Sequence, residues 1–101
     1  MPIYQTARFQ VRSEVLEKCK AAIVQFVEAI RANEPGTRLY TAMREAQAKT
    51  NFLHYFIFED EAARDFHRTT DWVKRFTDIL YPETMSGVDF KFYTLVASTN
   101  E

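Results

Sequence analysis

Residues 52–58 read FLHYFIF, and apolar or aromatic side chains fall on both sides of this stretch, with His54 as its only strongly polar member. A strand in an antiparallel sheet that faces water on one side would carry a polar residue at every second position. This strand does not, so both of its faces need cover. The stretch therefore predicts a central strand with a protein layer on each side.

The segments around this strand show two kinds of periodicity. Residues 3–12, 38–45 and 88–97 alternate with period two, which predicts strands, and the polar residues 47–51 predict a break before residue 52. Apolar residues from Val15 to Ile30 recur at helical spacing after Ser13, a good N-cap, and residues 33–36 end that helix. Residues 60–80 predict a second helix, ended by Pro82.

The predicted order is β-α-β-β-α-β, the split βαβ arrangement of ferredoxin-like α+β proteins. Right-handed crossovers place both helices on one face of a four-stranded antiparallel sheet. The opposite face is then apolar and uncovered, which is rare in a monomer. We expect residues 1–101 to form one domain that pairs through this sheet face into a homodimer, a dimeric α/β barrel.

Composition excludes several classes of function. The 101 residues are 47% hydrophobic and 27% charged with a net charge of −1, so no nucleic-acid partner is expected. No apolar run approaches the length that spans a bilayer, and the first residues do not resemble a signal peptide, which predicts a cytoplasmic protein without a membrane partner. Cys19 is the only cysteine, and its place in the helical stripe predicts a buried thiol.

Two stretches resemble the antibiotic biosynthesis monooxygenase family, including its quinol monooxygenase branch. EPGTRLY at 34–40 resembles the family's helix-to-strand turn, and DEAARDFHRTTDWVKRF at 60–76 is similar to its second helix, where an acidic pair and two alanines precede a His. The resemblance implies oxidation of a small aromatic quinol or phenol by O₂, with no cofactor. Many members carry a Glu where Phe56 stands and a second His where Trp72 stands.

His67 is the expected catalytic base, because an imidazole titrates near neutrality. On one continuous helix Trp72 would lie about 140° around from His67, so both are not expected to face one narrow pocket. His54 is expected to be a satisfied buried residue. Neither His has a partner at metal-ligand spacing, so no metal is expected. A pocket between helices and sheet is expected to bind the substrate through Phe9, Tyr40, Phe56, Phe66 and Trp72.

Two alternative functions remain open at this point. A non-catalytic small-molecule-binding or stress-response barrel is favoured by Phe56, which replaces a carboxylate. A haem-binding or haem-degrading barrel would need an axial ligand, and His67 is the only obvious one.

Overall fold

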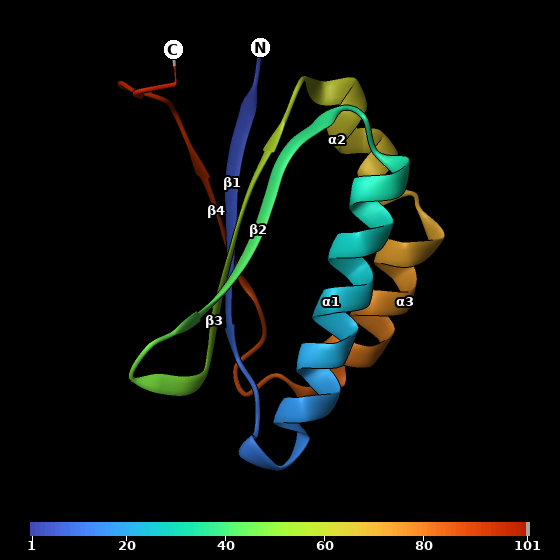
Figure 1. Ribbon diagram of the computed structural model, residues 1–101, viewed down its shortest axis with the longest axis vertical. Helices are drawn as coiled ribbons and strands as arrows, with labels where there is room; N and C mark the ends of the chain where they lie inside the picture. Colours follow the sequence, from blue (N-terminus) through green and yellow to red (C-terminus); the bar gives the residue numbers. More distant parts are fainter. Residues whose placement is uncertain (101) are drawn as a thin grey trace.

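The computed structural model describes residues 1–100 and shows a four-stranded sheet with its helices on one face (Figure 1). The strands pair antiparallel in the order β2-β3-β1-β4. This topology confirms the ferredoxin-like α+β fold. The elements are β1 (Ile3–Gln10), η1 (Ser13–Val15), α1 (Leu16–Asn33), β2 (Thr37–Glu45), β3 (Ala48–Phe58), α2 (Glu61–Arg68), α3 (Asp71–Leu80), η2 (Tyr81–Glu83) and β4 (Asp89–Tyr93).

The segment expected as one helix over 60–80 is two helices, α2 and α3, and this expectation was wrong. Thr69 Oγ1 donates a hydrogen bond to the Phe66 carbonyl at 2.9 Å. Thr70 caps α3, because its Oγ1 accepts from the Val73 N–H at 3.2 Å and donates to the His67 carbonyl at 2.9 Å. Threonines that bond to nearby backbone favour helix ends over helix interiors. Apolar periodicity did not reveal this break.

Other boundaries also differ from the sequence-based expectations. Ser13 lies in η1 and bonds to the Glu14 carboxylate, so it does not cap α1, which begins at Leu16. Strand β3 already begins at Ala48, because residues 48–51 pair with β2 and β1 despite their polar composition. The last strand ends at Tyr93 and not at residue 97.

The core lies between the sheet and the helices. Alternate residues of β1 and β3 point toward α1 and α3, and Cys19 is fully buried there as a free thiol, as expected. Burial raises the pKa of that thiol, so it stays protonated near neutral pH. The core residues between the sheet and the helices include Phe9, Ala22, Ile23, Phe26, Ile30, Phe52, Phe76 and Leu80.

The opposite side of the sheet, here called the outer face, has no helix over it (Figure 1). Strand pairing puts Leu39 beside Ile57 and Met43 beside Leu53 on this side, with Tyr55 between them on β3. Leu39 is 39% exposed and Met43 is 44% exposed. None of the helices described is long and apolar enough to cross a membrane.

Candidate functional site

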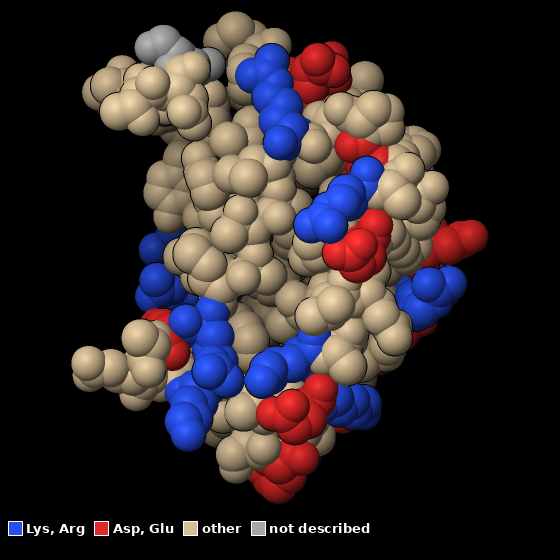
Figure 2. Space-filling view, in the orientation of Figure 1, with Lys and Arg blue, Asp and Glu red and all other residues tan. Residues whose placement is uncertain are grey.

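A cavity of about 410 Å³ lies between the helix-facing side of the sheet and the helices α1, α2 and α3. This volume is typical of sites that bind small molecules. Most of its wall is aromatic or aliphatic, and uncharged side chains dominate the middle of the face seen in Figure 2. The polar residues in the wall are Gln5, Tyr40, His54, His67, Arg68, Thr77 and Tyr81.

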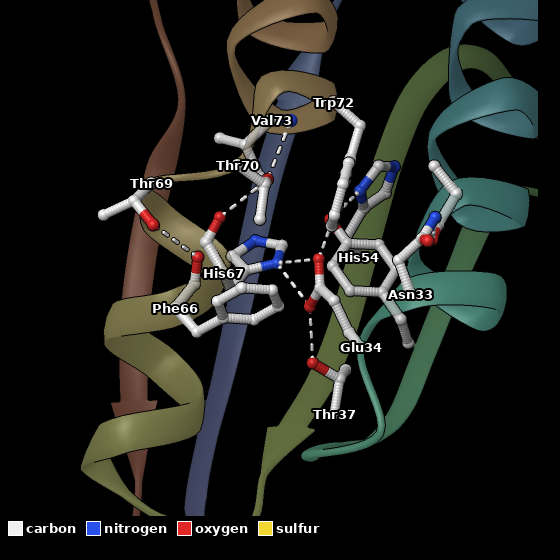
Figure 3. Close-up of polar contacts among 12 residues, drawn as sticks. Asn33, Glu34, Thr37, His54, Phe66, His67, Thr69, Thr70, Trp72 and Val73 are labelled. Atoms are coloured by element: carbon white, nitrogen blue, oxygen red, sulfur yellow. Dashed lines mark hydrogen bonds and ion pairs between the residues drawn. The ribbon is translucent and has the colours of Figure 1, made fainter.

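Beside the cavity, the buried carboxylate of Glu34 collects hydrogen bonds from three side chains (Figure 3). His67 Nδ1 lies 2.9 and 3.0 Å from the two carboxylate oxygens, and Thr37 Oγ1 donates at 2.6 Å. The indole N–H of Trp72 also donates to this carboxylate. Glu34 is only 4% exposed, so these donors replace the water that an exposed carboxylate would bind.

The charge of Glu34 is set by two opposed effects. Burial raises the pKa of the carboxyl, but the hydrogen bonds from His67, Thr37 and Trp72 and the nearby His67 ring lower it. Together the hydrogen bonds and the His67 ring outweigh the effect of burial, so the pKa of Glu34 lies below its ordinary value. The carboxylate is therefore ionised near neutral pH.

The turn after α1 packs directly on the start of α2, which brings Glu34 to His67. A Cβ atom placed on Gly36 would lie 2.6 Å from the Cβ of Ala63, so only glycine fits at this approach. The Glu59 N–H donates to the Gly36 carbonyl at 2.8 Å. Asp60 caps α2 by accepting from the Ala63 N–H at 2.9 Å. Residues 34–36 and 59–63 thus form the frame of the site.

This geometry fixes the tautomer of His67. An ionised carboxylate can only accept, so Nδ1 of His67 carries the hydrogen of their bond. In the neutral ring the other nitrogen, Nε2, then holds a free electron pair. In Figure 3 the Nε2 side of the ring is turned away from Glu34, and His67 borders the cavity. The arrangement is a carboxylate-oriented imidazole that can accept a proton.

His67 and Trp72 both reach Glu34, although only His67 lines the cavity, in keeping with the expectation that the two do not face one narrow pocket. The expected 140° separation assumed one continuous helix, and the break at Thr69 and Thr70 lets both side chains meet the same carboxylate. Trp72 consequently supplies an N–H donor at the position where many family members carry a second His. A ring nitrogen is retained there, although it cannot accept a proton.

The structure brings four of the six expected site residues to the cavity. Phe9, Tyr40, Phe56 and His67 line it. Phe66 and Trp72 do not, which corrects the expectation for both. Phe66 is 50% exposed and meets the Trp72 ring edge-on at 6.3 Å between centroids. The helix break is the cause, because α2 on its own turns Phe66 toward solvent.

Two other residues of the site, Glu34 and His54, depart from the sequence analysis. Glu34 was not expected there, although EPG at 34–36 offered a signal: an acid at a helix end before a tight turn. His54 was expected to be fully satisfied, but among residues 1–100 only its Nδ1 has a partner, the Tyr40 hydroxyl at 2.8 Å. Within residues 1–100, no three His, Cys, Asp or Glu side chains are grouped so as to hold a metal ion.

Comparisons with known proteins agree with this fold and family. The sequence profile described as antibiotic biosynthesis monooxygenase matches residues 2–78. A candidate monooxygenase of this kind from Bacteroides thetaiotaomicron superposes with a TM-score of 0.90 at 20% identity, covering 97% of this chain and 92% of that one.

Another such candidate, from Caulobacter crescentus, gives a TM-score of 0.88 at 18% identity, covering 95% and 91% of the two chains. SnoaB, a cofactor-independent oxygenase from Streptomyces nogalater, gives 0.82 at 15% identity, covering 99% and 98%. No curated protein matches the sequence.

Proposed function

Because the chain belongs to the antibiotic biosynthesis monooxygenase family, we propose that it is a cofactor-independent monooxygenase that oxidises a small aromatic quinol or phenol with O₂. The observation that carries this proposal is the pair formed by His67 and the buried Glu34 at the cavity wall. It supplies an oriented base beside an aromatic pocket. SnoaB, which shares the fold, is described as an oxygenase that needs no cofactor.

In the proposed reaction, Nε2 of His67 accepts the proton of the substrate hydroxyl. The carboxylate of Glu34 stabilises the imidazolium that forms, as an ionised partner does in other base–carboxylate pairs. The substrate anion then transfers electrons to O₂. For an anthrone-like phenol, one oxygen atom replaces two hydrogens on the ring carbon and the other leaves as water, so the substrate supplies all four electrons.

The walls of the cavity suit this chemistry. Phe9, Phe26, Phe56, Phe58 and Phe76 surround the space with aromatic rings. Such rings stack on a flat substrate and exclude water, and a low-polarity site strengthens the interaction between the base and its carboxylate. The size and the aromatic character of the pocket therefore support this substrate class.

We further propose that two copies of the chain pack through the outer face. The outer face is apolar and carries no cover in one chain. A large apolar patch of this kind marks an interaction site in soluble proteins. Because the cavity lies on the opposite side of the sheet, such a dimer leaves it accessible.

The test of the enzymatic proposal is oxygen uptake by the purified protein with a panel of quinols and anthrone-like phenols, with no flavin or metal added. Uptake above the buffer control is expected. His67→Gln should lower turnover by about 10²–10⁴-fold, because glutamine can still donate to Glu34 but cannot act as the base. Asp65→Ala, on the exposed side of the same helix, is the matched control and should be as active as the parent.

One result would count against the proposed activity, and another against His67 as the base. If no substrate is consumed faster than in buffer, the protein is not this oxygenase. If uptake occurs and His67→Gln is as fast as the parent, the oxygenase assignment stands and His67 is not the base.

Phe56 favours a second candidate, a non-catalytic binding barrel, because an apolar ring fills the wall where many members carry a Glu. Ligand binding without oxygen uptake would select that candidate.

A further inference from the structure

Gln5 is a buried polar residue in the cavity wall that the proposed reaction does not use. It lies on β1, and strand pairing sets it between Phe56 of β3 and Phe92 of β4, which also line the cavity. Successive side chains of a strand point to opposite faces of the sheet. Gln5 is two residues before Ala7 and four before Phe9, which both belong to the core. Its side chain therefore points toward the helices, the side on which the cavity lies.

The side-chain amide of Gln5 is open to the cavity. It has no hydrogen-bond partner among residues 1–100, although the whole residue is only 7% exposed. In the same part of the chain, the unpartnered side-chain atoms that are closed to solvent are Asn51 Oδ1 and His54 Nε2. The amide oxygen and nitrogen of Gln5 are not among them, so a molecule of the size of water reaches both. On this side of the sheet the space beside them is the cavity.

The amide and the proposed base border the same part of the cavity. Phe56 is the cross-strand neighbour of Gln5, and its ring centroid lies 6.4 Å from that of His67. Side chains opposite one another on paired strands start only about 5 Å apart. A flat ligand held against Phe56 is therefore next to both groups.

A primary amide can bond to an oxygen substituent in either of two forms. Its oxygen accepts from a hydroxyl, and its two N–H groups donate to a carbonyl. It does so without bringing a charge into an apolar wall, which would be far more unfavourable. A buried amide without a partner is itself unfavourable, and a ligand oxygen removes this penalty while a hydrocarbon does not. Sites built around such a group discriminate strongly between the two kinds of ligand.

We propose that Gln5 is a specificity-determining residue: its amide forms a hydrogen bond with an oxygen substituent of the aromatic ligand, so that the cavity selects arenes bearing a hydroxyl or carbonyl group over hydrocarbons of the same shape. The inference rests on the proposed function in taking the cavity as the ligand site. An apolar side chain of similar length should fit the empty cavity at least as well as Gln5.

The experiment compares 1-tetralone with tetralin, which has the same two rings without the carbonyl oxygen. In neutral His67 the nitrogen Nε2 can only accept, so a carbonyl cannot bond to it and the comparison excludes the base. NMR titration of the parent should show about tenfold tighter binding of 1-tetralone, the size of effect that one good hydrogen bond gives. Gln5→Met should lose this preference. Gln10→Met, the same substitution at an exposed position of β1 outside the cavity wall, should keep it.

Urea denaturation distinguishes this role from a structural one. Gln5→Met removes a buried amide that has no partner and keeps the length of the side chain, so the variant should be at least as stable as the parent. A marked loss of stability would show that the amide already has a partner in the folded protein, which would overturn the inference.

A further measurement does not depend on any variant folding. In the parent labelled with ¹⁵N-glutamine, a side-chain amide proton of Gln5 should move downfield on addition of 1-tetralone but not of tetralin. Unmoved amide protons, an unchanged preference in Gln5→Met, or no binding of either compound would also overturn the inference. None of these measurements involves O₂, so a protein that shows the preference but consumes no oxygen would refute only the oxygenase proposal.

Discussion

Glu34 joins three donors around one buried charge, so its removal affects both the site and the stability of the fold. Glu34→Gln keeps the shape of the side chain but replaces the charge with an amide that is itself partly a donor. We expect the free energy of unfolding at pH 7 to fall by about 1–3 kcal/mol, as for other buried polar groups left without a proper partner. Urea denaturation of both proteins measures this difference. Thr41→Val, on the other side of the sheet, should change it far less.

The stability of the parent and the stability of Glu34→Gln should depend differently on pH. The folded pKa of Glu34 is below its ordinary value of 4.5, so the unfolded chain binds more protons as the pH falls below 4.5. The stabilisation is therefore complete above pH 4.5 and is lost as the pH falls through the folded pKa. The stability difference between parent and Glu34→Gln should shrink in that range.

His54 does not disturb this comparison. Its pKa of about 4 makes both proteins lose stability between pH 6.5 and 4, when the unfolded chain gains the proton first. The effect cancels in the difference between parent and variant. A stability difference that stays constant from pH 7 to 3 would show that Glu34 is not held ionised in the folded protein.

At the scale of elements, periodicity was enough to predict the fold but not the site. The alternation in β1 and the stripe of α1 follow from repeating burial, and so they could be predicted from the sequence. The break at Thr69 and Thr70 depends on two side-chain hydrogen bonds to backbone, which leave no periodic signal. Because of that break, Trp72 reaches Glu34 and Phe66 does not line the cavity. The positions of these two side chains therefore could not be predicted from periodicity.

The contact between Gly36 and Ala63 gives a test at this scale. Gly36→Ala would place two Cβ atoms 2.6 Å apart, and neither belongs to a flexible side chain, so the turn must move away from α2. We expect a loss of about 1–3 kcal/mol of stability and a weaker contact between Glu34 and His67. Chemical denaturation measures the first effect, and the ¹⁵N signals of His67 report the second.

The double variant Gly36→Ala/Ala63→Gly is the control, because it restores the space by moving the missing methyl group to the other chain segment. It should recover most of the stability and the parent spectrum of His67. If Gly36→Ala alone is as stable as the parent and leaves that spectrum unchanged, the close approach does not position the site.

At the scale of the whole molecule, the two faces of the sheet have different roles. The helix-facing side holds the cavity, while the outer face carries Leu53, Tyr55 and Ile57 of β3 beside Met43, Thr41 and Leu39 of β2. The sequence FLHYFIF already required cover on both sides, and one chain provides it on only one. What covers the second side cannot follow from one chain alone, since it depends on another molecule.

A second copy of the chain is the proposed cover, and a charge on the outer face tests it. Light scattering at micromolar concentration should give the parent about twice the 11.9 kDa of one chain, because a stable interface here should bury more than roughly 1,000 Å². Tyr55→Glu places an unpaired charge in that interface and should give a monomer or an unfolded chain, which circular dichroism distinguishes. Val24→Glu adds the same charge at an exposed position of α1 and should remain dimeric. A parent protein with the mass of a monomer would refute the dimer, and the apolar outer face would then need a different partner.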